Sequence, residues 1–287
     1  MSTDPSLPKP ATVDVIVPSY RRADALKRAL ESVEEVRSAT AEWADLRVQV
    51  VDESEGSGEG PSAARNRAVA KGDAEFIALL DDDDLWLPTR LDRAVAVLQQ
   101  RDDVGLVCGD AKLASGGLFL GTDRRRGDRH HRDLTLDSFV CTSTVTMRRS
   151  EWEAAGGMDE SIRLAEDYEL YLRVTRYGMR IHVLDEVVAV YTDTGDGIGR
   201  DCGKMAAATL AALGKSGFPG FTKDEPDWAR RLGRLNASAA HWVMREHGDF
   251  KEGLRLALLA VGGAPRDKIS WTALVRGLLK TRRRLSR

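Results

Sequence analysis

Residues 60–91 read GPSAARNRAVAKGDAEFIALLDDDDLWLPTRL. At the centre of this stretch, 76–80 is a short apolar run, which predicts a buried strand. The run leads directly into four consecutive aspartates at 81–84. A helical pattern over 63–70 comes before the strand, and a proline introduces an amphipathic segment over 91–98. The stretch therefore predicts a helix–strand–helix unit with an acidic cluster at the carboxyl end of its strand.

The same alternation continues on both sides of this stretch. The β-branched run 13–17 predicts a strand, a helical pattern follows over 25–36, and further strands are predicted at 48–51 and 104–108. This order is typical of βαβ units on a parallel sheet, where ligands bind beyond the carboxyl ends of the strands. Polar clusters follow three of the strands, at 19–22, 52–54 and 81–84. We therefore expect these three segments to converge on one crevice.

The remaining sequence is less regular. The charged stretch 121–133 is predicted to be a mobile surface loop. Further strands are predicted over 139–147 and 181–191, and further helices over 151–157 and 167–177. From about residue 200 the chain is rich in alanine and leucine, and only helices are predicted, over 205–213, 228–246, 254–260 and 269–285. These patterns predict a disordered lead at 1–10, an α/β domain at 11–198 and a helical C-terminal subdomain at 199–287.

Composition excludes several classes of protein. The 287 residues carry a formal net charge of −2, so the overall charge does not suggest a nucleic-acid partner. Residues 1–10 lack the apolar core of a signal peptide, and no run of about 18 apolar residues is present. The three cysteines are widely spaced without a CxxC pair, which favours buried thiols over a disulfide or a zinc site. We expect a cytoplasmic protein.

The four aspartates at 81–84 are the first candidate for chemistry. Like charges this close repel one another, and some of them take up protons unless a cation neutralises them. A hard divalent ion bound through one or two carboxylates and phosphate oxygens would resolve this repulsion. The alternative is a solvated loop, or an N-cap for the helix that follows.

Three motifs connect this cluster to a known family. The segments VDVIVPSYRR (13–22), VQVVDES (48–54) and the stretch 60–91 resemble the family 2 glycosyltransferases. The resemblance covers about residues 11–192 and implies an inverting enzyme of the GT-A fold. That fold is a Rossmann-like α/β domain of nucleotide-diphosphate-sugar transferases, with a mixed sheet flanked by helices. The C-terminal helices would be an extension.

The resemblance implies donor-binding residues in the first two segments. They are Pro18, Ser19, Tyr20, Arg22 and Asp52. Arg21 stands where the family usually has asparagine, and Glu53 stands where a second aspartate is usual.

The 60–91 stretch contains the family's D-x-D motif, formed here by Asp81 and Asp83. The resemblance implies Mn²⁺ or Mg²⁺ as cofactor, held by Asp83 with Asp81. Asp81 and Asp82 would also contact the donor ribose or sugar. Arg65 would face the donor phosphates, as suits a guanidinium. The alternative for Arg65 is a surface position on a helix.

A second acidic segment supplies a candidate base. GGMDE (156–160) and LAEDYEL (164–170) are similar to the family's G-G-F-D-E and E-D-x-D-L pattern, with Met158 and Glu169 as departures. The resemblance implies that Asp167 is the general base and that Glu166 orients it or contacts the acceptor. Without the other motifs, an acidic pair opening a helix would indicate only a favourable interaction with the helix dipole.

Acceptor contacts are less clearly marked. Thr142 and Ser143 lie in a segment that resembles the strand beside the acceptor site, and Trp152 could stack on a sugar. Aromatic residues at such spacing are more often in the core. The family often places a histidine after its last strand, but none follows Tyr191 here, so Asp193, Asp196 or water would have to complete the metal shell.

The C-terminal segment 266–287 carries eight Lys or Arg residues and one Asp, a local charge of 8 − 1 = +7. With its apolar positions it predicts either peripheral contact with an anionic membrane face or a helix packed on its own domain. A homodimer is also compatible with the sequence.

Other functions fit less well. A nucleotidyltransferase would need a Gly-rich basic loop after the first strand, and a haloacid-dehalogenase-like phosphatase would need its aspartates there. A catalytically degenerate nucleotide-sugar-binding or scaffold protein is the alternative from another class. The expected partners are a nucleotide-diphosphate sugar and an acceptor, which could be a glycan, a lipid-linked sugar or a small natural product.

Overall fold

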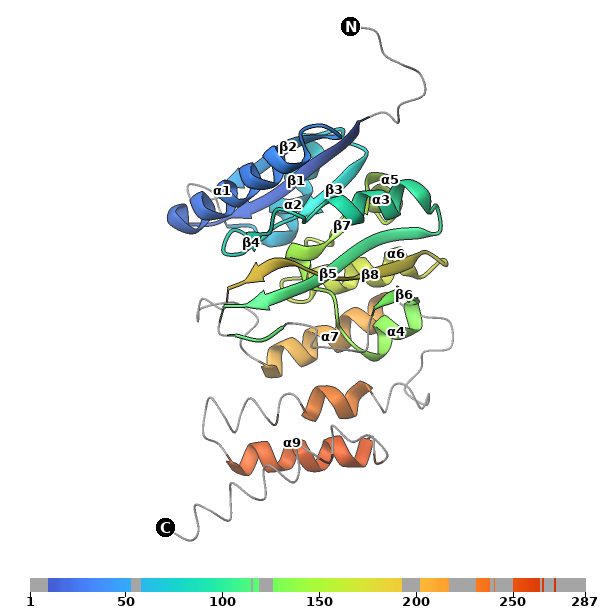
Figure 1. The fold of residues 1–287 in the computed structure, drawn as a ribbon. Coiled ribbons are helices and arrows are strands. Elements are labelled where there is room, and N and C mark those ends of the chain that lie inside the picture. The colour runs from blue at the N-terminus through green and yellow to red at the C-terminus, as the bar shows by residue number, and fades with distance from the viewer. Residues whose placement is uncertain are drawn as a thin grey trace, which may run out of the picture. The chain divides into compact units, whose positions relative to one another are not determined.

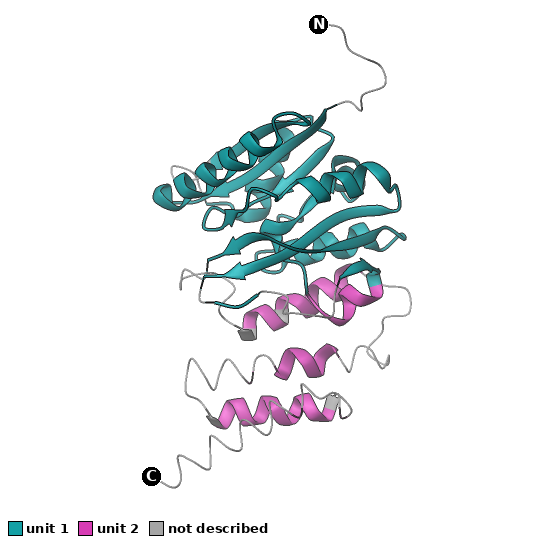
Figure 2. Ribbon diagram, viewed as in Figure 1, with its two compact units in different colours: residues 1–131, 139–195 teal, residues 132–138, 196–287 magenta. Residues whose placement is uncertain are grey.

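The computed structural model describes residues 10–52, 58–114, 116–118, 126–192, 202–216, 231–237, 240, 250–263, 265 and 271. The chain divides into two compact units (Figure 2). Unit 1 consists of Met1–His131 and Phe139–Gly195, and unit 2 consists of Arg132–Ser138 and Asp196–Arg287.

Unit 1 is built on one mixed sheet (Figure 1). Among the described residues its strands are β1 (Ala11–Ser19), β2 (Ala44–Asp52), β3 (Phe76–Leu79), β4 (Leu85–Trp86), β5 (Val104–Leu113), β6 (Gly127–Arg129), β7 (Thr146–Arg148) and β8 (Arg180–Tyr191). The order is β2-β1-β3-β7-β5-β8-β4, with β6 paired to β8. The pairs β1/β2, β1/β3 and β5/β8 are parallel, and the other pairs are antiparallel.

Helices connect and flank these strands. They are α1 (Ala23–Thr40), α2 (Pro61–Ala70), α3 (Asp92–Gln100), α5 (Arg149–Ala154) and α6 (Glu166–Thr175), with α4 (His131–Leu136) at the boundary of the two units. The expected mixed α/β fold with flanking helices is confirmed. Most predicted elements are present, with ends that differ by a few residues.

The core of unit 1 includes one buried ion pair. Asp14 on β1 is fully buried, and its Oδ2 lies 2.5 Å from Nη2 of Arg149. The same carboxylate accepts hydrogen bonds from the Ala74 amide at 3.0 Å and from Gln49 at 3.1 Å. A Cβ on Gly72 would lie 2.0 Å from Oδ2 of Asp14, so the packing there requires glycine. Because the charge is paired and hydrogen-bonded, the acid is tolerated within a β-branched strand.

The predicted strand over 139–147 is wrong for most of its length. Thr142–Thr144 form the 3₁₀ turn η1, and β7 begins only at Thr146. The Thr144 hydroxyl donates to the Cys141 carbonyl at 2.7 Å, and the Ser143 hydroxyl donates to Asp84. Such side-chain hydrogen bonds compete with the ladder of a sheet, which is why β-branched composition alone was misleading.

The predicted loop over 121–133 is also wrong in its second half. Gly127–Arg129 form β6, which pairs antiparallel with β8. Asp128 accepts hydrogen bonds from Arg101 at 2.7 and 2.8 Å, and one of its oxygens lies 2.7 Å from Nδ1 of His182. Long-range pairing therefore orders a segment whose local composition is typical of a loop. Residues 121–125 lie outside the described part of the chain.

Unit 2 is helical where it is described. It contains α7 (Cys202–Ser216), a helical stretch at 231–237 and α9 (Phe250–Gly263). Ala237, Ala240, Ala257 and Ala260 form a small core. Arg231 donates to the Leu136 carbonyl at 3.1 Å, so 132–138 packs with this unit. Apart from residue 271, the predicted helix over 269–285 and its basic residues lie outside the described residues. Among the described helices, none combines the length and apolar character needed to cross a bilayer.

Candidate active site

The carboxyl ends of β2, β1 and β3 lie side by side. Ser19 at the end of β1 is in register with Asp52 at the end of β2, and β3 pairs with the other edge of β1. The aspartates at 81–84 follow β3 directly. The ends of the three strands therefore lie together as predicted, while residues 53–54 and the side chain of Asp52 lie outside the described part of the chain.

The first turn after β1 exposes an aromatic ring. Pro18 is partly buried and Ser19 is buried, whereas Tyr20 is 44% exposed. Arg21 lies over the Tyr20 ring, 5.0 Å from its centroid. Arg21 has a φ of 57°, in the left-handed region that asparagine tolerates better than arginine. Arg21 therefore adopts this backbone conformation at a greater cost in strain than asparagine would.

Arg22 is paired with the acidic cluster. Its Nη1 lies 3.3 Å from Asp82 and also contacts Asp83. Burial raises the pKa of Asp82 and of Asp83, and the charge of Asp81 raises both further. The attraction of Arg22 acts in the opposite direction. The pKa values of Asp82 and Asp83 are still raised overall, so Arg22 does not fully compensate the negative charge of the cluster.

The fourth aspartate, Asp84, has a different environment. It is 1% exposed and accepts hydrogen bonds from the Ser143 hydroxyl at 2.6 Å and the Thr192 amide at 2.8 Å. Burial, with a further contribution from the charge of Asp81, raises the pKa of Asp84 to about 7. Asp84 is thus a structural acid that joins η1 to the end of β8. A run of four identical residues contains no signal for this distinction.

We expect Asp84→Asn to change how the stability of the metal-free protein depends on pH. The pKa of Asp84 is about 7 in the folded protein, whereas the ordinary pKa of an aspartate, expected in the unfolded chain, is 3.8. Between these values the folded state keeps a proton that the unfolded state releases, so wild-type stability falls as pH rises. Asparagine removes this contribution. The stability of the variant relative to wild type should rise between about pH 4 and pH 8, by up to roughly 4 kcal/mol.

Denaturant unfolding in the presence of EDTA measures this difference. Asparagine can still accept from the Thr192 amide and donate to Ser143, so the packing should be retained. A stability difference that does not vary with pH would contradict a buried, protonated Asp84.

Arg65 on α2 connects two acidic segments that are far apart in sequence. Its Nη2 lies 2.5 Å from Asp81, and its Nη1 lies 3.0 Å from Glu166. Its side chain is 6% exposed. Burial lowers the pKa of Arg65, but the charges of Asp81 and Glu166 outweigh this effect and raise it. Arg65 is therefore buried and does not occupy the surface position considered as the alternative. Its guanidinium lies between two carboxylates.

The second acidic segment opens α6. Ala165, with a φ of 57°, comes directly before Glu166 and Asp167. Asp167 is partly exposed; its Oδ1 accepts from the Tyr168 amide at 2.7 Å, and its Oδ2 accepts from the Thr142 hydroxyl. Glu166 is buried, and both burial and the charge of Asp167 raise its pKa. The more accessible carboxylate of the pair is therefore Asp167.

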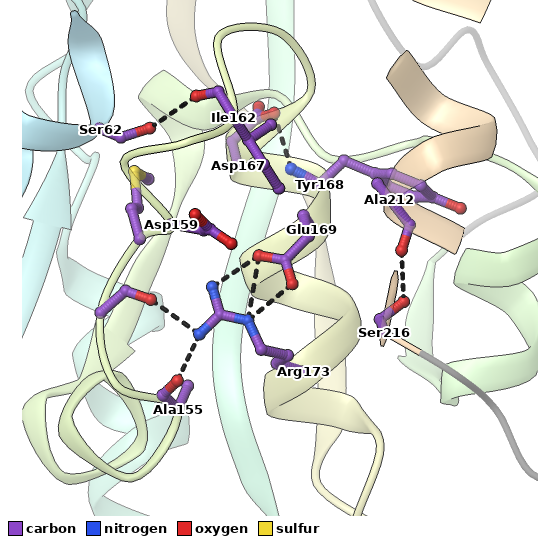
Figure 3. A network of polar contacts seen from close by, with 12 residues as sticks. Ser62, Ala155, Asp159, Ile162, Asp167, Tyr168, Glu169, Arg173, Ala212 and Ser216 are labelled. Atoms are coloured by element: carbon purple, nitrogen blue, oxygen red, sulfur yellow. Dashed lines mark hydrogen bonds and ion pairs between the residues drawn. The ribbon is translucent and has the colours of Figure 1, made fainter. Parts of the chain in front are cut away.

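Two polar networks hold the loop before α6. Asn66, next to Arg65, donates to the Met158 carbonyl and accepts from the Met158 amide, both at 2.9 Å. Figure 3 shows the second network, in which Arg173 pairs with Glu169 and donates to the Ala155 carbonyl. Asn66 was not among the predicted site residues, although the A-R-N motif contained it.

The structure places the predicted acceptor residues inside unit 1. Ser143 is fully buried, Thr142 is 8% exposed and Trp152 is 4% exposed. Thr142 contacts Asp167, and Ser143 contacts Asp84. Their role toward an acceptor remains a prediction. Asp193 and Asp196 lie outside the described residues.

The donor set is compatible with a divalent cation. No group of three or more metal-ligating side chains occurs among the described residues. A hard ion can bind through one or two carboxylates when phosphate oxygens and water complete its shell. Asp81 and Asp83 could supply such carboxylate oxygens, and a cation there would relieve the repulsion by which Asp81 raises the pKa of Asp83.

Comparison with known proteins shows the fold and the family. Amylovoran biosynthesis glycosyltransferase AmsB of Erwinia amylovora is 25% identical over 188 residues, which cover 62% of this chain and 59% of AmsB. The match thus spans less than two thirds of that relative. The mannosyltransferase PcManGT from Pyrobaculum calidifontis, in complex with GDP-Man and Mn²⁺, has a TM-score of 0.57 at 18% identity, covering 97% of this chain and 82% of its own.

TarS of S. aureus, residues 1–349 in complex with UDP, has a TM-score of 0.51 at 15% identity, covering 93% of this chain and 88% of its own. Unit 1 has the GT-A fold that these structures share. The family description "Glycosyltransferase like family 2" matches residues 10–196, well over half of the 287. The resemblance found in the sequence is confirmed, and the chain belongs to this family of glycosyltransferases.

Proposed function

We propose that this protein transfers one sugar from a nucleotide-diphosphate donor to an acceptor hydroxyl, with inversion at the anomeric carbon. One observation carries the proposal. Asp81 of the first acidic segment and Glu166 of the second, far apart in sequence, both pair with the buried guanidinium of Arg65. Inverting transfer needs such a pair of centres, one for the departing diphosphate and one for the acceptor proton.

The donor is assigned to the β1, β2 and β3 ends. Tyr20 offers an exposed ring beside Ser19, and Asp52 lies in register with Ser19 on the neighbouring strand. Arg22 supplies a cation next to Asp82 and Asp83, where a diphosphate would bring negative charge. Asp83 with Asp81 would hold Mn²⁺ or Mg²⁺, which when bound would stabilise the charge on the departing diphosphate as a Lewis acid.

The acceptor side is assigned to the start of α6. Asp167 takes the proton of the acceptor hydroxyl while that oxygen attacks the anomeric carbon. The bond to the nucleoside diphosphate breaks on the opposite face, which inverts the configuration. Glu166, held by Arg65, keeps the helix start in place beside the donor carboxylates. The acceptor class would be a glycan, a lipid-linked sugar or a small natural product.

A ligand panel tests the proposal. Thermal unfolding is measured with UDP, GDP, dTDP and their sugars, with and without Mn²⁺ or Mg²⁺. A ligand present at about 100 times its dissociation constant should stabilise the fold by roughly 2.7 kcal/mol. We expect one nucleotide to act, only with metal, and its effect to disappear in Asp83→Ala.

The outcomes separate the two candidate functions. If no nucleotide or nucleotide sugar stabilises the protein against thermal unfolding, the transferase proposal is wrong. A nucleotide effect without turnover in the wild type would favour a degenerate nucleotide-sugar-binding protein.

A further inference from the structure

The 3₁₀ turn η1 contacts both acidic segments through neighbouring residues. The Thr142 hydroxyl donates to Oδ2 of Asp167. The Ser143 hydroxyl donates to Asp84 at 2.6 Å and accepts from the Asp81 amide at 3.1 Å. Two adjacent residues thus connect the backbone at the start of the 81–84 run to the proposed base.

The turn itself is anchored from the core. The Ser143 carbonyl accepts hydrogen bonds from Nε1 of Trp86 at 2.9 Å and from Nε of Arg90 at 3.3 Å. Arg90 also donates to the Thr146 hydroxyl at 2.9 Å, and its guanidinium lies 5.0 Å from the Trp86 ring centroid. Arg90 is fully buried, and burial lowers its pKa to about 9. Burying a charged guanidinium beside neutral groups costs free energy, and the hydrogen bonds of Arg90 to the Ser143 carbonyl and the Thr146 hydroxyl offset part of that cost. These contacts fix the position of the turn.

A direct role in acceptor binding fits these contacts less well. Ser143 has no exposed surface and Thr142 has 8%, while Asp167 is partly exposed. The Thr142 hydroxyl donates its hydrogen bond to Asp167, so it has no O–H left to donate to an acceptor. A carboxylate has about four lone-pair sites, so Asp167 can still take a proton while it accepts from Thr142 and Tyr168.

We propose that Thr142 is a positioning residue for the base Asp167, and that η1 fixes this base relative to the donor carboxylates through Ser143. This inference rests on the proposed function and deepens it. The other charged or titratable groups that act on Asp167 are Glu166 on its own helix, Arg65 on α2, Tyr171 and Cys141.

The test compares Thr142→Val, which removes the hydroxyl at nearly constant shape, with Thr142→Ser, which keeps it. The assay is hydrolysis of UDP-glucose or GDP-mannose, whichever the ligand panel selects, followed as release of the nucleoside diphosphate. With water as the acceptor, the reaction still needs the base. A hydrogen bond to a charged group is worth enough that its loss should lower kcat about 10- to 100-fold.

The split between kcat and KM gives a readout that a loss of stability alone would not move. The donor KM should stay within about twofold, because Thr142 does not contact the donor side. Thr142→Ser should restore kcat to within about threefold.

Thr40→Val is the matched control, because Thr40 is fully buried and its hydroxyl bonds only within α1, to carbonyls such as that of Val36 at 2.9 Å. It should lower the melting temperature without lowering kcat. Wild-type kcat in Thr142→Val would overturn the inference, and so would equal losses in the valine and serine variants. If Asp167→Asn keeps wild-type turnover, the proposed function itself fails. If Asp167→Asn is inactive and Thr142→Val is normal, only this inference fails.

Discussion

Asp167→Asn is expected to lower kcat for donor turnover by about a thousand-fold. The variant keeps the shape of the side chain: its amide oxygen can still accept from the Tyr168 amide, and its NH2 group can donate to the Thr142 hydroxyl oxygen. It cannot take up the proton of the attacking hydroxyl. Donor affinity should change little, because the donor is assigned to the ends of β1, β2 and β3. Rates of nucleoside-diphosphate release and isothermal titration with the donor measure the two quantities separately.

Asp24→Asn is the control for this prediction. Asp24 is an exposed acid in the first turn of α1, so it resembles Asp167 in its relation to a helix dipole. If acids at helix starts act only through the dipole, both variants should lose a few tenths of a kcal/mol, up to roughly 1 kcal/mol, of stability and neither should lose turnover. Retention of more than about a tenth of kcat in Asp167→Asn would remove this residue from the role of base.

Arg65→Leu should have the largest effect on stability. The change leaves Asp81 and Glu166 without their shared partner, and Glu166 is nearly fully buried. Removing one member of a buried ion pair costs roughly 3–5 kcal/mol, because the remaining charge stays buried. Asp81 is partly exposed, so most of the loss should come from the Glu166 side. Urea unfolding at neutral pH gives the free energy of unfolding.

Arg67→Leu on the same helix is the matched control. Arg67 pairs with Glu59, and both side chains are about half exposed. Exposed pairs contribute little, so this variant should lose less than about 1 kcal/mol. Adding Glu166→Gln to Arg65→Leu should recover part of the lost stability, since it removes the unpaired charge. Equal losses in the Arg65 and Arg67 variants would show that Arg65 does not bridge buried charges.

Local features of the sequence were sufficient for much of the fold. The apolar runs of β1 and β3 are short and end in polar residues, so the strands and the sheet edge where polar residues gather could be predicted without tertiary information. The helices α1, α2 and α3 were also predicted from local sequence. Their exact ends were not, because the last turns depend on packing as well as on propensity.

The sequence also located both acidic segments and the family. The D-x-D motif and the E-D pair are each a short continuous stretch of sequence, so a comparison of motifs finds each of them directly. Their roles as metal ligand and base remain predictions, which the experiments above test. What the motifs could not indicate was that the two segments meet at Arg65, because contacts across about a hundred residues depend on how the chain packs.

Tertiary structure alone decided the remaining features of the site. Asp84 differs from its three neighbours only because Ser143 and Thr192 enclose it. The segment around Thr142 has β-branched composition, yet its hydroxyls bond to Asp167 and to local carbonyls and form a turn. Composition and periodicity describe a residue and its near neighbours along the chain. Burial, pKa and hydrogen-bond partners are set by residues distant in sequence, and the structure was needed to show which ones.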